Sequence, residues 1–318
     1  MQLSTNELKV SELSPVKKNK IWIDIKKDWD LYLLLIPGLI TLFIFKYTPM
    51  YGLIIAFQDF NIFSGIAGSD WVGLAHFKKL FTSPEFINVF KNTLIISISK
   101  IVILFPLPII LALLLNEIKN LLFKKSIQTV IYLPHFISWV IVSGLFMNLL
   151  SVNGGIVNTI IAKFGMEPIP FFMEPNVFRP LLVITEGWKE VGWGTIVYLA
   201  AITGIEQEQY EAARIDGANK FQQIKSITLP GIAPTIVLMF IIRLGNILEA
   251  GTEQILVMYN SVVYNVSDVI GTYVYRVGLG TSDYSFSTAV GLFNSVVAFI
   301  LVVTGNYLCK RFLGKSIW

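Results

Sequence analysis

The stretch Glu211–Pro230, EAARIDGANKFQQIKSITLP, carries three cationic and two anionic side chains between two long apolar runs. Written as a helix, Glu206–Asp216 aligns small and polar residues on one side, with charged residues around the rest. Gly217 ends that helix, and Ala218–Ile227 forms a second short helix that Leu229-Pro230 terminates. The stretch is therefore predicted to be two short surface helices joined at Gly217.

The composition of the whole chain indicates whether this polar stretch belongs to a soluble protein or to a membrane protein. Of its 318 residues, 54% are hydrophobic and 14% are charged, whereas soluble domains carry about 25% charged residues. The composition thus predicts an all-α integral membrane protein. Its lysines stand at the ends of apolar runs, a distribution that does not suit nucleic acid. One cysteine and two histidines exclude a disulfide framework and a Cys/His metal cluster.

Six segments come near the roughly 20 apolar residues that a membrane-spanning helix needs. They lie at residues 29–47, 92–115, 127–150, 179–203, 232–250 and 288–308. Pro106, Pro108 and Pro134 fall inside two of these segments and predict kinked helices. The predicted architecture is a bundle of six transmembrane helices within residues 29–312, preceded by a polar segment, 1–28, and followed by a short tail, 313–318.

Lysine and arginine in short loops mark the cytoplasmic side of a membrane. They are concentrated before span one, between spans two and three, and after span six, which all fall on one side when the spans number six. Both termini and the loop 206–230 between spans four and five are then cytoplasmic. The long, lysine-poor loops 48–91, 151–178 and 251–287 lie outside, where an extracytoplasmic partner would meet them.

The loop Glu211–Pro230 has two interpretations, a connector on the membrane surface or a docking element, and the spacing of its residues favours the second. Its charge pattern also fits an amphipathic connector that lies on lipid headgroups. Its residues follow the spacing EAA-x3-G-x9-I-x-LP, however, with Glu211-Ala212-Ala213, Gly217, Ile227 and Leu229-Pro230. In this the loop resembles the EAA loop in the membrane subunits of ABC importers.

Further motifs resemble the carbohydrate-uptake branch of that family, of maltose-permease type. They are Trp71-Val72-Gly73-Leu74 with Phe77, Phe86 with Asn92-Thr93, and Asp216-Gly217-Ala218. Other motifs resemble the subgroup often called LplB-like, which is linked to complex oligosaccharides. These are Gly245-Asn246 with Glu253-Gln254, and Tyr273-Val274-Tyr275-Arg276 with Gly291-Leu292-Phe293. The likeness runs from about Leu31 to Phe312, nearly the whole chain.

The resemblance implies a permease subunit of a bacterial, binding-protein-dependent importer in the plasma membrane. Such a subunit is a type I importer bundle that forms half of the translocation pathway for an oligosaccharide. Its implied partners are a second homologous permease, two copies of a cytosolic ABC ATPase and an extracytoplasmic solute-binding protein. The EAA loop acts as a coupling helix that docks on the ATPase. The residues implied in this coupling are Glu211, Ala212, Ala213, Arg214, Asp216, Gly217, Ile227, Leu229 and Pro230.

ATP hydrolysis is expected on another chain. The phosphate-binding motif G-x-x-x-x-G-K-[ST] is absent, because Gly314-Lys315-Ser316 has Cys309 in place of the first glycine. Motifs of intramembrane proteases are absent too, so the chain is not expected to be an enzyme. It is also expected to hold no metal or cofactor of its own. ATP and Mg²⁺ are expected on the ATPase subunits. A self-sufficient secondary transporter or channel is the competing interpretation, although it would favour inverted repeats that the sequence does not display.

Span four carries three charged residues, Glu186, Lys189 and Glu190, in one helical sector. In one interpretation, Lys189 neutralises a glutamate and the group packs against span five, where Arg243 is a further partner. In the other, the carboxylates line a cavity and accept hydrogen bonds from sugar hydroxyls, while a tryptophan stacks on a sugar ring. The candidate pathway residues are Trp139, Glu186, Trp188, Glu190, Trp193, Asn246 and Glu249.

Three other polar residues in the spans are given structural roles. Lys100 is expected to snorkel or to pair, and Asn294 to hydrogen-bond across helices. His135 is expected to share a helical face with Trp139 at a packed kink beside Pro134. The identity of the sugar is left open, and an acidic oligosaccharide is one of the alternatives.

Overall fold

The computed structural model describes residues 27–314, 316 and 317. The chain divides into two units, one of residues up to Ile54 and one of residues from Ile55 on. Nearly all of the predicted N-terminal segment 1–28 lies outside the described residues, as do two residues of the predicted tail 313–318. The secondary structure of the described part is helical apart from one pair of two-residue strands.

The first unit is one apolar helical stretch. Helix α2 spans Trp29–Leu42 and continues as a π-helical turn, Phe43–Tyr47, and then as the 3₁₀ helix Thr48–Phe57, which ends in the second unit. Pro37 lies inside α2, where its carbonyl accepts a hydrogen bond of 2.8 Å from the Thr41 hydroxyl. The helix runs past the predicted boundary at residue 47 because the residues that follow are apolar as well.

The second unit holds the remaining elements. Strands β1 (Gln58–Asp59) and β2 (Asp70–Trp71) pair antiparallel. The α-helices are α3 (Ala75–Thr82), α4 (Pro84–Leu104), α5 (Pro106–Glu117), α6 (Leu121–Tyr132), α7 (Trp139–Leu149), α8 (Ile156–Lys163), α9 (Pro175–Thr203), α10 (Gln207–Ile215), α11 (Lys220–Gln223), α12 (Leu229–Gly245), α13 (Thr252–Met258), α14 (Tyr264–Ser267), α15 (Ile270–Tyr275) and α16 (Tyr284–Leu313). Short 3₁₀ or π-helical turns lie at Leu133–Phe136, Ile224–Thr228, Ile247–Glu249, Ser261–Val263 and Arg276–Gly280.

Four helical stretches among the described residues are long and apolar enough to cross a membrane. They are Trp29–Phe57, Pro84–Glu117, Lys220–Gly245 and Tyr284–Arg311. The number is five if α6 and α7, which meet at a bend of 105°, count as one span. Helix α9 has 29 residues, enough to cross, but its apolar sequence is interrupted by several charged residues.

The effect of each proline on helix continuity depends on the local structure around it. Pro134 lies in the 3₁₀ turn Leu133–Phe136, and the chain bends just after this turn, so the predicted span 127–150 is two helices instead of one kinked helix. Pro106 and Pro230 each follow a local irregularity in the helix: Phe105 lies between α4 and α5, and the π-helical turn Ile224–Thr228 precedes α12. The helical stretches Pro84–Glu117 and Lys220–Gly245 continue across these positions. The prediction that Leu229-Pro230 ends the helix before span five is therefore wrong.

Residues 251–287 are the main departure from the predicted topology. They were expected to form an external loop, but α13, α14 and α15 in this region contribute to the core of the second unit. One core cluster joins residues of this region with residues of α4 and α9: Ile255, Met258, Val263, Val269, Ile96, Phe178, Leu181 and Leu182. Burying each such side chain stabilises the fold by about 1.5–3 kcal/mol. The region is thus packed structure.

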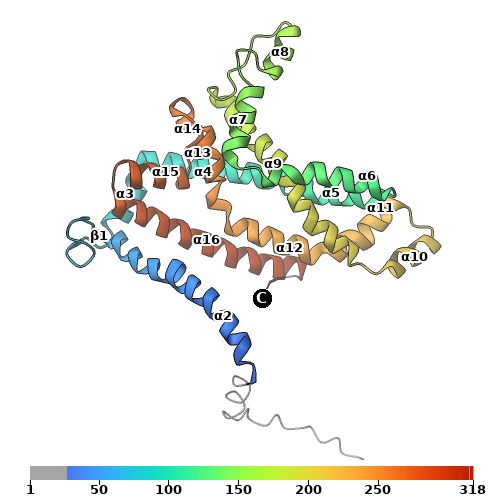
Figure 1. Cartoon of the computed structure of the whole chain (residues 1–318), viewed down its shortest axis with the longest axis horizontal. Coiled ribbons are helices and arrows are strands. Elements are labelled where there is room, and N and C mark those ends of the chain that lie inside the picture. The colour runs from blue at the N-terminus through green and yellow to red at the C-terminus, as the bar shows by residue number, and fades with distance from the viewer. Residues whose placement is uncertain (1–26, 315, 318) are drawn as a thin grey trace, which may run out of the picture. The chain divides into compact units, whose positions relative to one another are not determined.

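The second unit carries different elements at its two ends (Figure 1). Helices α10 and α11 lie at one end, beside the ends of α5 and α12, and helices α3, α14 and α15 lie at the other. Helix α9 packs along α5, and α12 packs along α16. This arrangement separates the polar segment 206–230 from the packed region 251–287, with the charged part of α9 between them.

Candidate functional site

Residues 206–230 contain a short surface helix, α10, and the joint at Gly217, as predicted, but the helix after the joint begins at Lys220 and continues into α12 instead of ending as a second short helix. Helix α10 ends in a Schellman motif, in which the Ala218 N–H donates to the Ala213 carbonyl at 2.8 Å and the Gly217 N–H donates to the Arg214 carbonyl at 3.1 Å. Gly217 has φ +79°, and no atom lies within 4 Å of the position that a Cβ would occupy. Glycine is thus favoured here for its left-handed backbone, since no other part of the described chain lies within 4 Å of that position.

Two side-chain contacts fix this segment. The Tyr210 hydroxyl of α10 lies 2.9 Å from the Thr228 hydroxyl, which closes the segment on itself just before α12. Lys220 Nζ lies 2.8 Å from Glu117 Oε2 at the end of α5 and holds the segment against the bundle. Of the predicted coupling residues, Ala213, Ile227 and Leu229 are half-buried. The exposed ones are Glu211, Ala212, Arg214, Asp216, Gly217 and Pro230. The segment is anchored on one side, and its other side is exposed.

The charged residues of α9 take part in two ion-pair networks. In the first, the Glu186 carboxylate lies 2.5 Å from Lys100 Nζ of α4 and 2.5 Å from Arg243 Nη2 of α12. Lys100 also donates to the Ala250 carbonyl at 2.8 Å and to Gln254 Oε1 at 2.6 Å, and only 1% of its side chain is exposed. The pairing predicted for Lys100, and the one considered between Arg243 and Glu186, are both present.

The turn after α12 belongs to the same network and was not predicted. Gly251 has φ +78°, and a Cβ on it would lie 2.5 Å from Lys100 Nζ. Gln254 donates to the Leu182 carbonyl and to the Thr185 hydroxyl of α9, each at 2.7 Å. No local pattern in the sequence predicts these contacts, because they join residues that are far apart along the chain.

The second network surrounds Glu190, one turn further along α9. Its carboxylate lies 2.7 Å from His135 Nδ1 and 3.2 Å from Lys189 Nζ, which also donates to the His135 carbonyl at 2.6 Å. The His135 ring stacks on Trp193 with centroids 4.4 Å apart, and Lys189 Nζ lies 5.5 Å from the centre of the Trp139 ring. His135 and Trp139 do not share a helical face as predicted, because the chain bends between them.

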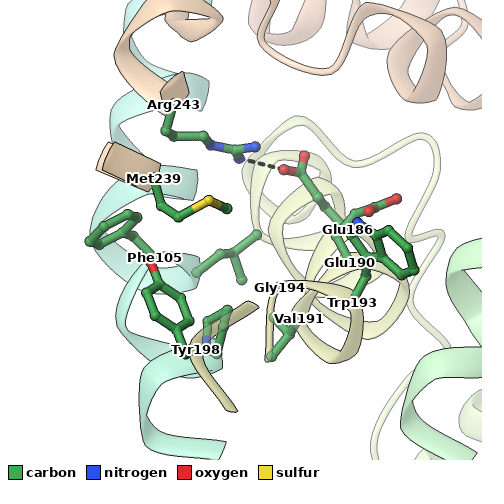
Figure 2. Close-up of a pocket in the computed structure, with 11 residues that line it drawn as sticks. Phe105, Glu186, Glu190, Val191, Trp193, Gly194, Tyr198, Met239 and Arg243 are labelled. Atoms are coloured by element: carbon green, nitrogen blue, oxygen red, sulfur yellow. Dashed lines mark hydrogen bonds and ion pairs between the residues drawn. The ribbon is translucent and has the colours of Figure 1, made fainter. Parts of the chain in front are cut away.

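Two hollows meet at the pair formed by Glu186 and Arg243. The first has a volume of about 180 Å³ and a mostly apolar lining. Figure 2 shows Arg243 and Met239 of α12 on one side of it, facing Glu186, Glu190 and Trp193 of α9. The second hollow has a volume of about 210 Å³ and is more polar. Its polar and aromatic lining residues are Ser97, Lys100, Trp139, Glu186, Glu190, Arg243, Asn246 and Glu249.

The candidate pathway residues lie mainly on these hollows. Trp193 lines the first, Trp139, Asn246 and Glu249 line the second, and Glu186 and Glu190 line both. Trp188 lines neither and packs edge-on against Phe146 instead. The carboxylates of α9 are therefore paired and cavity-lining at once, so the two interpretations of this group do not exclude each other.

Asn294 does not make the hydrogen bond across helices that was predicted for it. Its side-chain oxygen is buried and has no hydrogen-bond partner among the described residues. The same described part of the chain contains no group of three His, Cys, Asp or Glu residues arranged to hold a metal ion.

Comparison with known proteins places this geometry in context. The family model for the "binding-protein-dependent transport system inner membrane component" matches residues 104–313. The chain is 47% identical over 302 residues to the polygalacturonan/rhamnogalacturonan transport system permease protein YteP of Bacillus subtilis strain 168, covering 95% of this chain and 94% of that protein. It is 46% identical over 288 residues to the protein LplB of the same strain, covering 91% of each.

Two solved structures share the fold over nearly the whole chain. One is a bacterial ABC transporter involved in the import of the acidic polysaccharide alginate. Its matching chain is 44% identical, with a TM-score of 0.85, and the match covers 92% of this chain and 99% of that one. The other is the bacterial alginate ABC transporter in complex with an alginate pentasaccharide-bound periplasmic protein. Its matching chain is 43% identical, with a TM-score of 0.86 and coverage of 94% and 100%.

Proposed function

The chain belongs to the family of inner membrane components of binding-protein-dependent transport systems, and we propose that it forms half of the translocation pathway of an ATP-driven importer for oligosaccharides. The observation that carries this proposal is the exposed two-helix segment 206–230 in a chain of this family. Such a segment offers a docking surface to a cytosolic ATPase. The chain itself is then the permease, and ATP and Mg²⁺ bind to the ATPase subunits.

The relatives support an oligosaccharide as the cargo. YteP is named as a permease for polygalacturonan and rhamnogalacturonan, and the two solved structures come from importers of alginate. The hollows beside α9 suit such a cargo chemically. They combine aromatic rings, on which the apolar face of a sugar stacks, with carboxylates that accept hydrogen bonds from sugar hydroxyls.

The size of the hollows supports pairing with a second permease. Each hollow is smaller than the roughly 300 Å³ at which ordinary ligand sites begin. An oligosaccharide of several rings therefore needs a second wall. We assign that wall to a second homologous permease, and the delivery of the sugar to an extracytoplasmic solute-binding protein, as in the alginate complex with its periplasmic protein.

We propose six membrane spans, with both termini cytoplasmic. The spans are Trp29–Phe57, Pro84–Glu117, the bent pair α6 and α7, α9, Lys220–Gly245 and α16. The loop between α5 and α6 and the start of α6 hold three lysines, Lys119, Lys124 and Lys125. This loop follows Glu117, which pairs with Lys220 of α11. The segment 206–230 thus lies at the lysine-rich end of the bundle, which supports its assignment to the cytoplasm. Residues 1–28 and 313–318 are assigned to the same side.

The continuity of Lys220–Gly245 suggests how docking reaches the pathway. Helix α11 follows the Gly217 joint and continues through the π-helical turn Ile224–Thr228 into α12 as one helical stretch. The far end of α12 carries Arg243, which lines both hollows. When closure of the ATPase dimer moves α10 and α11, this helix transmits the displacement to the wall of the pathway as a rigid element.

The proposal is tested by reconstitution. The chain is purified from its native membrane together with the proteins bound to it, and the complex is placed in vesicles. The expected result is a complex with an ATPase and a second permease that takes up an oligosaccharide only when ATP and the binding protein are supplied. Uptake by the purified chain alone, driven by an ion gradient, would instead identify a secondary transporter or channel.

A further inference from the structure

We propose that Arg243 binds a carboxylate of the transported sugar, so that the cargo is an oligosaccharide that contains uronic acid residues. The proposal rests on the proposed function, because it requires the two hollows to lie on the transport pathway. It follows from the balance of charge around Glu186 and from the hydrogen bonds that each charged group has already formed.

Lys100 by itself neutralises Glu186. An ammonium group has three N–H donors, and those of Lys100 are taken by Glu186, the Ala250 carbonyl and Gln254 Oε1. Lys100 is almost completely buried, so it has no further partner to find in solvent. Arg243 is a second cation on the same carboxylate. The group Lys100–Glu186–Arg243 therefore has one surplus positive charge, and the arginine carries it.

Arg243 keeps donors available for another anion. Among the described residues, Glu186 is its only hydrogen-bond and ion-pair partner, through Nη2. Its side chain is 41% exposed and lines both hollows. A guanidinium group offers five N–H donors in a planar fork, and this fork matches the two oxygens of a carboxylate. Glu186 fixes the orientation of the fork while the remaining donors stay accessible from the hollows.

The other charged residues nearby do not satisfy Arg243. Glu190 is paired with Lys189 and His135. Glu249 lines the polar hollow and is exposed, but it forms no ion pair within the described part of the chain. Trp193 lines one of the two hollows that Arg243 lines, and Trp139 lines the other, so each hollow offers an aromatic ring on which a sugar stacks when its carboxylate reaches the guanidinium.

The test compares two trisaccharides in the reconstituted complex with its own binding protein, partner permease and ATPase. One is a trimer of galacturonic acid, and the other is a trimer of galactose with the same linkages. ATP-driven uptake of each is measured for Arg243→Gln, Arg243→Lys and Glu249→Gln, and is divided by the wild-type uptake of the same sugar. This division removes the preference of the unchanged binding protein.

The proposal predicts that Arg243→Gln lowers relative uptake of the acidic trimer at least tenfold more than that of the neutral trimer, because a charge-assisted hydrogen bond is lost. Arg243→Lys, which keeps the charge and an ion pair with Glu186, should fall between Arg243→Gln and wild type. Glu249→Gln should leave the ratio unchanged or favour the acidic trimer. Equal loss of both sugars in Arg243→Gln and Arg243→Lys overturns the proposal, as does wild-type uptake of the neutral trimer alone. If the wild-type complex takes up no oligosaccharide at all, the proposed function itself fails.

Discussion

Two regions of this chain hold charged side chains in different surroundings, α10 and α11 at the surface and the group around Glu186 between α4, α9 and α12. At the surface the ion pair Lys220–Glu117 has side chains that are 65% and 39% exposed, so water screens it. Around Glu186 the side chains of Lys100 and Glu186 are 1% and 7% exposed, and each charge depends on the other. The surface charges are therefore available to a partner protein, whereas the buried ones fix the geometry of the bundle.

The largest effect is expected from removing the charge of Glu186. Glu186→Gln leaves Lys100 buried and without its anion, which costs about 3–5 kcal/mol of stability. Thermal unfolding of the purified complex in detergent measures the loss. The double variant Lys100→Met/Glu186→Gln removes the uncompensated charge and should recover part of it. Equal stability of Glu186→Gln and wild type would show that the buried group does not hold the bundle together.

A smaller effect is expected at the turn that closes over this group. Gly251→Ala places a Cβ against Lys100 Nζ and forces alanine into a left-handed backbone, at a cost of about 1–3 kcal/mol. Gly291→Ala in α16 is the matched control, because no atom lies within 4 Å of its Cβ position and its backbone is helical. The same unfolding measurement should separate the two variants. Identical melting curves would contradict the role given to this turn.

A substitution at Gly217, the joint between α10 and α11, should reduce the coupling to ATP hydrolysis more than it reduces the stability of the complex. Gly217→Ala places alanine at φ +79°, which costs roughly 1–2 kcal/mol locally and displaces α11 from α10. Asparagine tolerates this conformation better, so Gly217→Asn is the matched variant. We expect substrate-stimulated ATP hydrolysis by the complex to fall more in Gly217→Ala than in Gly217→Asn. The reverse order would show that the left-handed backbone is not what the joint requires.

The smallest effect on stability is expected at the surface ion pair. Lys220→Gln removes the contact of α11 with Glu117 and should change the stability of the complex by about 0–1 kcal/mol. Unfolding curves at low and at high salt test this, because wild type should approach the variant as salt rises. A loss as large as that of Glu186→Gln would remove the distinction between the two regions.

The surface segment was predictable from the sequence because its determinants are local. Gly217 needs only its neighbours to close a Schellman motif, and Asn219 with Gln222 forms a capping box that starts α11. The continuation of the helix past Pro230 was not predictable in the same way. A π-helical turn, Ile224–Thr228, stands directly before α12, and the helical stretch Lys220–Gly245 continues across the proline.

The buried group was predictable only in part. Opposite charges in neighbouring spans suggested that Arg243 pairs with a glutamate of α9, and the structure contains that pair. The contacts of Lys100 with Ala250 and Gln254 join residues 150 and 154 positions apart, which no periodicity announces. Region 251–287 was taken for a loop because its helices are short and include polar residues. Burial of Gln254 and Thr272 depends on partners that only the folded chain supplies.

The most direct test of the account is substrate-stimulated ATP hydrolysis by the assembled complex carrying Glu211→Arg. Glu211 is exposed on α10, away from both hollows, so the substitution should leave insertion and folding intact. A reversed charge at this position should disturb the contact with the ATPase. The account predicts that the substrate no longer raises the rate of hydrolysis above its basal value. Stimulation equal to that of wild type would contradict the assignment of residues 206–230 as the coupling element.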